Sequence, residues 1–397
     1  MKILILNSGS SSIKYQLIQM PAKKVLCKGM IDAIGKKNGI TSYKSDAVEI
    51  KEKQEIPDHK LGLLKIADLL LDKDKGVIKN SDEIAIVGHR VVHGGNSFSE
   101  TTLIDKAVKD KIKQLCSLAP LHNPHNLEGI ILAETIFTAA KQVAVFDTAF
   151  HQTIPVKAKK YAIPNEFYTE HGIQVYGFHG TSHKYVSEVA SEYLENKKAK
   201  LITVHLGNGC SMTAVSEGKS IDHSLGFTPS NGLIMGTRCG DIDQTIIFHL
   251  VNTLGYSLEE VNALLVKKSG MYGLTGYSDL REIEAEAEKG NKACILALEM
   301  NAYRIKKYIG AYTAAMNGLD ALVFTAGIGE NSATLRAMVC RDMDYMGLHL
   351  DAARNTAKKA SIREINTPAA KVKILVVPTD EELEIAKQAH ELLGQLV

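Results

Sequence analysis

The chain has 397 residues, of which 45% are hydrophobic and 23% charged. This composition is typical of a globular protein, and the length predicts two domains. The net charge of +2 gives no basic field, so nucleic acid is not an expected partner, and no apolar run reaches the ~18 residues that span a bilayer. The six cysteines are scattered, which in a chain without a secretory leader predicts a cytoplasmic location.

Short runs rich in Val, Ile and Leu predict strands, and helical patterns lie between several of them. This alternation in both halves predicts an α/β fold with two lobes, and a hairpin at the start of each half predicts mixed sheets. The expected strands cover residues 2–6, 12–18, 84–88, 143–147, 201–206, 211–216, 320–325 and 372–377. The expected helices cover residues 60–72, 124–140, a segment beginning at Thr181 or Ser182, 291–317 and 380–395.

One pattern occurs twice. Residues 3–17 and residues 201–215 each contain an apolar run, a turn of Gly and small polar residues, and a second apolar run. Gly9 of the first copy aligns with Gly207 of the second. Such turns present backbone N–H groups to an anion, so the repeat predicts two similar domains that handle phosphate. The expected domains are residues 1–148 with 383–397, and residues 149–382.

Two further kinds of loop predict phosphate chemistry. In residues 325–332, T-A-G-I-G-E-N-S, a strand ends at a Gly-x-Gly turn, although Ser332 stands where a dinucleotide fingerprint has its third Gly. Arg90 and Arg238 lie in Gly-rich loops, where a planar guanidinium can bind a carboxylate or a phosphoryl group. Solvated arginines or local ion pairs are the simpler alternative.

The acidic and histidine residues leave two interpretations open. Asp147 ends a strand and Glu381 begins a helix, so each could hold Mg²⁺ or simply cap its element. His179 could donate a hydrogen bond to a developing charge. We expect His179 to precede a helix and not to share a face with His183. His122 and His125 are three residues apart, but no standard zinc motif occurs in the sequence, and no zinc site is predicted.

The order of the motifs resembles the acetokinase family, the acetate kinases, over essentially the whole chain. The motifs are N-S-G-S-S-S-I-K, G-H-R-V-V-H-G-G, A-P-L-H-N-P, V-F-D-T-A-F-H-Q-T, Y-G-F-H-G-T-S-H, H-L-G-N-G, M-G-T-R-x-G-D-I-D, T-A-G-I-G-E-N-S and P-T-D-E-E-L. The resemblance implies the duplicated actin-like and sugar-kinase fold, which is related to ribonuclease H. It also implies reversible transfer of phosphate from ATP to acetate with Mg²⁺ (Mn²⁺ as a substitute), and a homodimer.

The resemblance also implies roles for individual residues. Asn7 and Glu381 form the magnesium site, and Arg90 contacts the carboxylate substrate. Asp147 is the catalytic acid, with His179 and Arg238 as transition-state stabilisers. The acetate methyl is surrounded by Val92, Leu121, Phe178 and Pro229. The nucleotide is bound by Lys14, His205, Leu206, Gly207, Asn208, Gly209, Asp279, Leu280, Arg281, Gly327, Ile328, Gly329, Glu330 and Asn331.

Some positions depart from the family pattern, among them His125, Ser230-Asn231 and Cys239, but none removes a charged catalytic group. An acid with a pKa near ~4 is ionised at neutral pH, so it needs no general base. We therefore expect Asp147 to orient Mg²⁺ or its waters. Two alternatives remain at this point: a propionate kinase, disfavoured by the bulk of Val92, and a non-catalytic actin-like nucleotide switch.

Overall fold

Two mixed β-sheets organise the computed structural model, which describes residues 1–357 and 361–395. The first belongs to a unit made of Met1–Phe150 and a returning segment that begins at Asp380, and the second to a unit made of His151–Thr379. The sequence expectation placed the second boundary at 382/383, whereas the structure groups Glu381 with the first unit. Residues 396–397 of the expected domain lie outside the described residues.

The first unit contains an eight-stranded sheet in the order β5-β4-β3-β2-β1-β6-β8-β7. Its strands are β1 (Lys2–Ser8), β2 (Ser12–Gln19), β3 (Lys24–Asp32), β4 (Gly39–Ser45), β5 (Glu49–Gln54), β6 (Ile84–Val91), β7 (Thr102–Leu103) and β8 (Lys141–Phe146). Its helices are α1 (His59–Leu71), η1 (Ser81–Glu83), α2 (Lys106–Gln114), η2 (Leu115–Ser117), α3 (Asn123–Ile136) and α15 (Glu381–Gly394).

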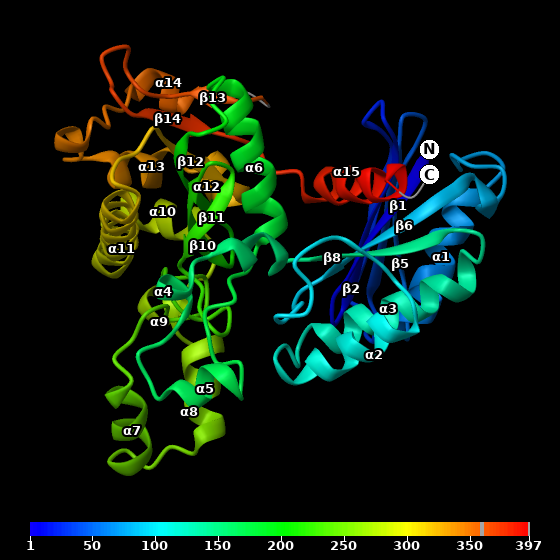
Figure 1. Ribbon diagram of the computed structural model, residues 1–397, viewed down its shortest axis with the longest axis horizontal. Coiled ribbons are helices and arrows are strands. Elements are labelled where there is room, and N and C mark those ends of the chain that lie inside the picture. Colours follow the sequence, from blue (N-terminus) through cyan, green and yellow to red (C-terminus); the bar gives the residue numbers. More distant parts are fainter. Residues whose placement is uncertain (358–360, 396–397) are drawn as a thin grey trace. The chain divides into compact units, whose positions relative to one another are not determined.

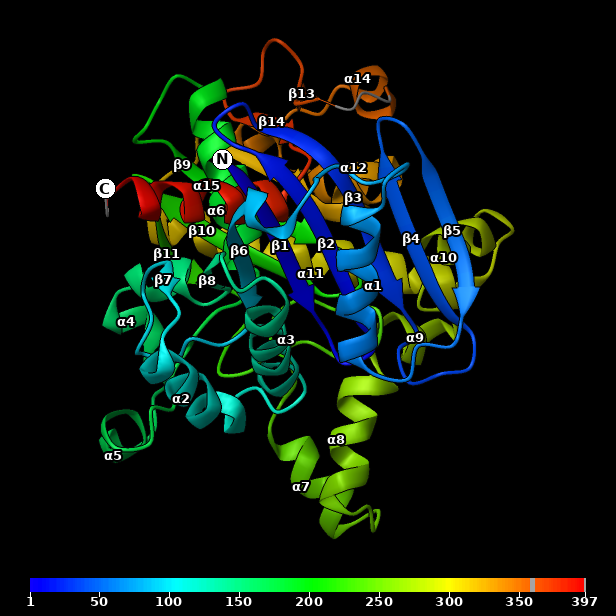
Figure 2. The same cartoon turned by 90° about the vertical axis from the view of Figure 1, so that its right-hand side faces the viewer.

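Strand β1 is buried on both faces because helices cover both sides of the sheet. Ile3 and Ile5 pack in one apolar cluster with Ile385 of α15. Leu4 and Leu6 point to the other side, into the cluster that includes residues of α1 and α3. Figure 2 shows α1 and α3 in front of the blue strands. The period-two pattern of β1 therefore sorts its side chains between two cores.

The second unit contains a six-stranded sheet in the order β11-β10-β9-β12-β14-β13. Its strands are β9 (Lys200–Leu206), β10 (Cys210–Ser216), β11 (Lys219–His223), β12 (Ala321–Thr325), β13 (Arg363–Glu364) and β14 (Lys373–Val376). Its helices are η3 (Ala149–Thr153), which starts at the boundary, α4 (Val156–Lys159), α5 (Asn165–Thr169), α6 (Gly180–Tyr193), α7 (Thr245–Asn252), α8 (Leu258–Lys267), α9 (Gly270–Thr275), α10 (Leu280–Glu288), α11 (Lys292–Met316), α12 (Ala326–Asn331), α13 (Ala333–Cys340), η4 (Asp344–Met346) and α14 (Ala352–Thr356).

The two sheets share one topology. In the first, β3-β2-β1 are antiparallel and β1-β6-β8 are parallel. In the second, β11-β10-β9 are antiparallel and β9-β12-β14 are parallel. The repeated sequence pattern corresponds to the hairpins β1–β2 and β9–β10, so the predicted duplication and the α/β fold with mixed sheets are confirmed.

The chain crosses from one unit to the other twice, and after each crossing it forms a helix that packs on the sheet of the unit it has entered. After β8 the chain enters the second unit, where α6 packs on β9 and β12. After β14 it returns to the first unit, where α15 packs on β1, β6 and β8. Figure 1 shows α15 in red, beside the blue β1. The first unit is therefore assembled from both ends of the chain.

Some elements differ from the predictions. Strands β3, β4 and β5 were not predicted, because exposed Lys and Glu residues interrupt their apolar pattern. Helix α6 begins at Gly180 with His179 at its N-cap, not at Thr181 or Ser182. None of the helices within the described residues combines the length and apolar character that a membrane span requires.

Candidate active site

Three predicted site residues lie on one face of the first sheet, where the parallel strands β1, β6 and β8 end. Asn7 is near the end of β1, Arg90 near the end of β6, and Asp147 directly after β8. Because side chains alternate along a strand, each continues the face that α15 covers further back. The residues two positions earlier belong to that face or lie against α15: Ile5, Gly88 and Val145.

Arg90 and Asp147 form a bidentate ion pair. The Arg90 Nε lies 3.0 Å and 3.1 Å from the two Asp147 carboxylate oxygens, and Nη2 donates to Oδ2 at 2.5 Å. Burial disfavours the charge of Arg90, but the carboxylates of Asp147 and Glu381 outweigh burial and raise the pKa of Arg90. Asp147 is 1% exposed, so this pair is held in a fixed geometry.

The first turn of α15 brings two more charges to this face. The Glu381 carboxylate lies 3.9 Å from the Arg90 Nε, and Glu382 pairs with Lys14 at 2.5 Å. Asp380 caps the helix by accepting from the backbone N–H of Leu383. Burial raises the pKa of Glu381; Arg90 opposes that rise, and the nearby carboxylates add to it.

We call the group formed by Asn7, Arg90, Asp147 and Glu381 the magnesium corner. Its carboxylate and amide oxygens are the ligands that Mg²⁺ prefers. Both oxygens of Asp147 already accept from Arg90. The contact described for the Glu381 carboxylate is the longer 3.9 Å ion pair, which leaves its oxygens more available. Asn7 extends from the same sheet face, directly opposite Lys14 in the β1–β2 register.

The sequence reasoning missed two asparagines of α3 that fix this corner. The Asn126 side chain donates to the carbonyl of Ser8 at 2.7 Å and accepts from the N–H of Val92 at 3.0 Å. Asn123 makes a pair of 3.0 Å bonds with the backbone of His93. These bonds hold the ends of β1 and β6 together. The Asn-x-x-Asn spacing of Asn123 and Asn126, at the end of the A-P-L-H-N-P motif, was the available signal.

In the second unit the corresponding sheet face is polar and buried under α6. His205 and Thr203 of β9 lie opposite Ser211 and Thr213 of β10 in the hairpin register. The Ser182 hydroxyl of α6 contacts His205 Nδ1 at 2.9 Å and Thr379 Oγ1 at 2.8 Å. Because these groups of β9, β10 and α6 are buried, and Thr379 is half-buried, this hydrogen-bond network takes the place of an apolar core.

His179 lies within this network. It has a left-handed backbone (φ 55°) at the N-cap of α6, and its ring stacks on His205 with 4.4 Å between centroids. His179 Nδ1 lies 2.9 Å from Ser211 Oγ, and His183 Nε2 lies 2.7 Å from the same atom. The two histidines therefore converge on one hydroxyl, and the expectation that they would not share a face is wrong. His183 is buried and its Nδ1 is fixed by Thr203.

Phe178 is held by two further histidines. Its carbonyl accepts from His151 Nε2 at 3.0 Å, and its N–H donates to His223 Nε2 at 3.1 Å. Burial lowers the pKa of His151 to about 3 and that of His223 well below its usual value. Two neutral rings fit this arrangement, because His151 Nε2 then carries the proton that it donates and His223 Nε2 has the lone pair that accepts.

Arg238 lies beside the Gly-rich turn of β9–β10. Its Nη1 donates to the carbonyl of Pro229 at 2.7 Å, and burial lowers the pKa of the guanidinium. A Cβ added to Gly209 would lie 3.5 Å from His179 Nε2 and 3.7 Å from Arg238 Nη1. The turn therefore approaches both predicted transition-state residues. A Cβ on Gly236 would meet Asn208 Oδ1 at 2.0 Å, so a larger residue here would displace the Asn208 amide from the turn.

A hydrogen bond links two predicted nucleotide-binding segments, residues 279–281 at the start of α10 and residues 327–331 in α12. Asp279 caps α10 and pairs with Arg281, while residues 327–331 fall in α12. The hydroxyl of Ser332, just after α12, bonds to Glu284 of α10 at 2.5 Å. Glu330 accepts from the N–H of Thr379.

The predicted acyl-pocket residues are divided between the units. Val92 and Leu121 belong to the first, and Phe178 and Pro229 to the second. Phe178 is 2% exposed, whereas Leu121 is 62% exposed. Of the two residues in the first unit, Val92 is therefore buried and Leu121 is exposed.

Comparisons with known proteins agree over the whole chain. The model of the Acetokinase family matches residues 2–387. The chain is 64% identical over 393 residues to acetate kinase of Flavobacterium johnsoniae, which covers 99% of this chain and 100% of that protein. It is 50% identical to the acetate kinase of Thermotoga maritima, covering 100% of both.

Two solved structures are similar in fold and sequence. The acetate kinase of Porphyromonas gingivalis has a TM-score of 0.94 at 44% identity, with 99% of each chain covered. A propionate kinase from Francisella tularensis subsp. tularensis SCHU S4 has a TM-score of 0.92 at 43% identity, with 98% of each chain covered.

Proposed function

This chain belongs to the acetokinase family, and from that premise we propose that it is an enzyme that transfers the γ-phosphoryl group of ATP to acetate, reversibly, giving acetyl phosphate and ADP. The observation that carries the proposal is the corner where Arg90 contacts both Asp147 and Glu381, with Asn7 near the end of the neighbouring strand β1. It combines a half-buried cation for an anionic substrate with oxygen donors for a divalent metal.

Arg90 binds the substrate carboxylate in this proposal. Asp147 occupies the edge of the guanidinium formed by Nε and Nη2. The remaining edge, Nη1 with the second proton of Nη2, matches a carboxylate in a bidentate geometry. Because Asp147 fixes the plane of the guanidinium, Arg90 is already oriented before the substrate binds. Binding therefore costs little additional side-chain entropy at Arg90.

Asp147 acts as a positioning residue and not as a general base. Acetate is already ionised at neutral pH, so the attacking oxygen has no proton to lose. Both Asp147 oxygens accept hydrogen bonds from Arg90, which supports an orienting role. The expected orientation of Mg²⁺ waters by Asp147 remains part of the proposal, since Asn7 and Glu381 would hold the metal nearby.

His179 and Arg238 neutralise the charge on the transferring phosphoryl oxygens. Their shared proximity to Gly209 supports this pairing, and Ser211 fixes the ring of His179. Mg²⁺ (or Mn²⁺) supplies charge neutralisation between the nucleotide phosphates when bound. In this proposal Lys14 binds the nucleotide, and so do three segments of the second unit, residues 205–209, 279–281 and 327–331.

The direct test is formation of acetyl phosphate, trapped with hydroxylamine as the hydroxamate. The full-length chain is incubated with Mg-ATP and acetate, and a reaction without acetate is the control. We expect hydroxamate that depends on ATP, Mg²⁺ and acetate together. ATP hydrolysis or nucleotide binding without acetyl phosphate would contradict the proposal and favour the nucleotide-switch alternative.

Propionate is the competing acyl substrate, because a propionate kinase has nearly the same structural similarity as an acetate kinase. Val92 is 8% exposed, and its bulk favours the smaller acid. One methylene is worth about 1–3 kcal/mol, so kcat/KM for acetate should exceed that for propionate by roughly ten- to two-hundredfold. A ratio below one would assign the chain to propionate.

We also propose a homodimer and a cytoplasmic location. Leu296, Met300 and Tyr303 of α11 follow a helical spacing and are 55%, 37% and 67% exposed, an apolar stripe suited to a second copy. All six cysteines are free thiols, which fits a reducing compartment. Sedimentation of the parent and of Tyr303→Glu tests the dimer: the variant should sediment as a smaller species.

A further inference from the structure

A cluster of two histidines and a glutamate lies beside the phosphate turn of the first unit. His59 is the first residue of α1, and His125 and Glu128 are one turn apart on α3. One ligand atom from each residue falls within 4.8 Å of the other two. The cluster takes no part in the proposed reaction.

The hydrogen bond of His59 determines which of its ring nitrogens is free to bind a metal. His59 Nε2 lies 2.7 Å from the carbonyl of Gly9, and a carbonyl can only accept, so Nε2 carries the proton. With one proton on the ring, Nδ1 then has a lone pair that can bind a metal. Histidines that bind metals commonly donate their other N–H to a backbone carbonyl in this way.

The contacts within the cluster are too long for hydrogen bonds. His59 Nδ1 lies 3.9 Å from Glu128 Oε2, and His125 Nδ1 lies 3.8 Å from the same oxygen. The two imidazole rings are nearly parallel, with 5.6 Å between centroids. Ligands of a tetrahedral metal are about 3.3 Å apart when the metal–ligand distances are about 2.0–2.1 Å. A small side-chain adjustment therefore brings the three atoms onto one ion.

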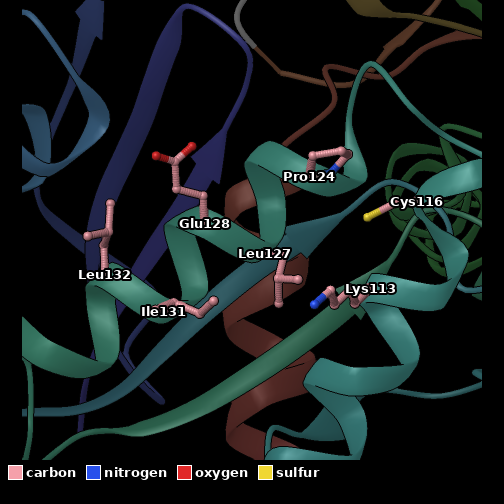
Figure 3. Close-up of a pocket in the computed structure, with 7 residues that line it drawn as sticks. All are labelled: Lys113, Cys116, Pro124, Leu127, Glu128, Ile131 and Leu132. Atoms are coloured by element: carbon pink, nitrogen blue, oxygen red, sulfur yellow. The ribbon is translucent and has the colours of Figure 1, made fainter.

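Figure 3 shows the Glu128 carboxylate extending from α3 away from Lys113. Glu128 is 48% exposed and His125 33%, which gives an ion a route from solvent and room for a water ligand. His59 is 9% exposed and supplies the buried side of the site.

From this geometry we propose that His59, His125 and Glu128 form a binding site for a late divalent transition metal, of which Zn²⁺ fits best. Two imidazole nitrogens, one carboxylate oxygen and an open fourth position match the ligands and coordination number of Zn²⁺. The magnesium corner lacks imidazole, so the two sites select different metals. Through His59 and Gly9, the ion would restrain the turn between β1 and β2.

The test uses the full-length chain stripped with EDTA and titrated with Zn²⁺ in a calorimeter, without nucleotide. We expect saturable binding that weakens at least tenfold in His125→Ala and in Glu128→Gln. His249→Ala is the matched control, since His249 is exposed on α7 in the other unit, and it should bind like the parent. Melting with EDTA shows whether each variant is folded.

Two further readouts identify the site. Co²⁺ should give a visible absorption band of low-symmetry coordination in the parent that is lost in both variants. Hydrogen exchange across residues 9–12 should slow with Zn²⁺ in the parent but not in His125→Ala. Zn²⁺ affinity and Co²⁺ spectra that are the same in the parent and both folded variants would overturn the proposal, as would no saturable binding at micromolar Zn²⁺. Unchanged exchange despite binding would overturn the restraint of the turn.

Discussion

Replacing Asp147 with Asn tests the orientation of Arg90 most directly. Asparagine keeps the shape of the side chain but offers one acceptor oxygen in place of two, and its NH₂ group faces the donors of Arg90. Arg90 then keeps its charge without a matched partner. Glu381, 3.9 Å from Arg90 Nε, compensates only in part.

The expected magnitude follows from the burial of the pair. Removing one partner of a buried ion pair costs about 3–5 kcal/mol. The side chain of Asp147 is 2% exposed and that of Arg90 21%, so the lower end applies, about 3 kcal/mol. If that energy is lost from substrate positioning, kcat/KM for acetate falls about a hundredfold.

Two measurements separate the possible roles of Asp147. The hydroxamate assay gives KM for acetate and the half-saturating Mg²⁺ concentration, and urea unfolding gives stability. A role through Arg90 raises KM for acetate, whereas a role in orienting Mg²⁺ raises the metal requirement. Asp105→Asn is the control, because Asp105 caps α2 in the same unit and Asn caps equally well.

The reasoning is refuted by a variant of unchanged stability whose acetate and Mg²⁺ dependences are normal and whose pH profile alone is shifted. That result would make Asp147 a general base. A loss of activity in Asp105→Asn as large as in Asp147→Asn would equally refute a specific role, because it would attribute the effect to lost charge in general.

Three other outcomes follow from the second unit. Arg238→Ala should lower kcat more than tenfold with a smaller change in KM, and an unchanged kcat would contradict a transition-state role. Ser211→Ala should lower kcat by roughly tenfold, because His179 loses its 2.9 Å contact; normal kinetics in a folded variant would show that other contacts hold the ring. Stability should decline as the pH falls below about 6.5, because the unfolded chain binds protons there, while His151, whose pKa is lowered to about 3, stays neutral in the folded state. Urea unfolding at about pH 7.5 and 5 measures this, and equal stabilities would contradict it.

Much of the fold could be predicted because its central strands are continuous apolar runs with a repeated turn. The strands β1, β2, β9 and β10 carry that pattern, and their pairing follows from hairpin geometry. Strands β4 and β5 could not be predicted in this way, since polar residues interrupt both, and β5, the edge strand, has one apolar residue, the half-buried Ile50. Their register depends on neighbours and not on their own sequence.

The candidate site, like the fold, contains residues that the sequence predicts and contacts that it does not predict. The resemblance to the acetokinase family predicts that Asn7, Arg90 and Asp147 share one site, whereas the residues alone predict only that Asp147 ends a strand. The contact of Asn126 with Ser8 spans 118 residues, and no local pattern encodes it. The histidine cluster around Ser211 was missed for the same reason, because its members come from separate elements and have no standard spacing.

Helix α15 packs on the sheet of the first unit but follows the whole second unit in sequence, and this order has a consequence for synthesis of the chain. The second unit is continuous in sequence, so all of its residues precede Asp380. The first unit cannot close the apolar face formed by Ile3 and Ile5 until α15, at the carboxyl end, has left the ribosome. The unit whose translation begins first is therefore completed last, and a shortened carboxyl terminus would leave the nascent first sheet open to aggregation.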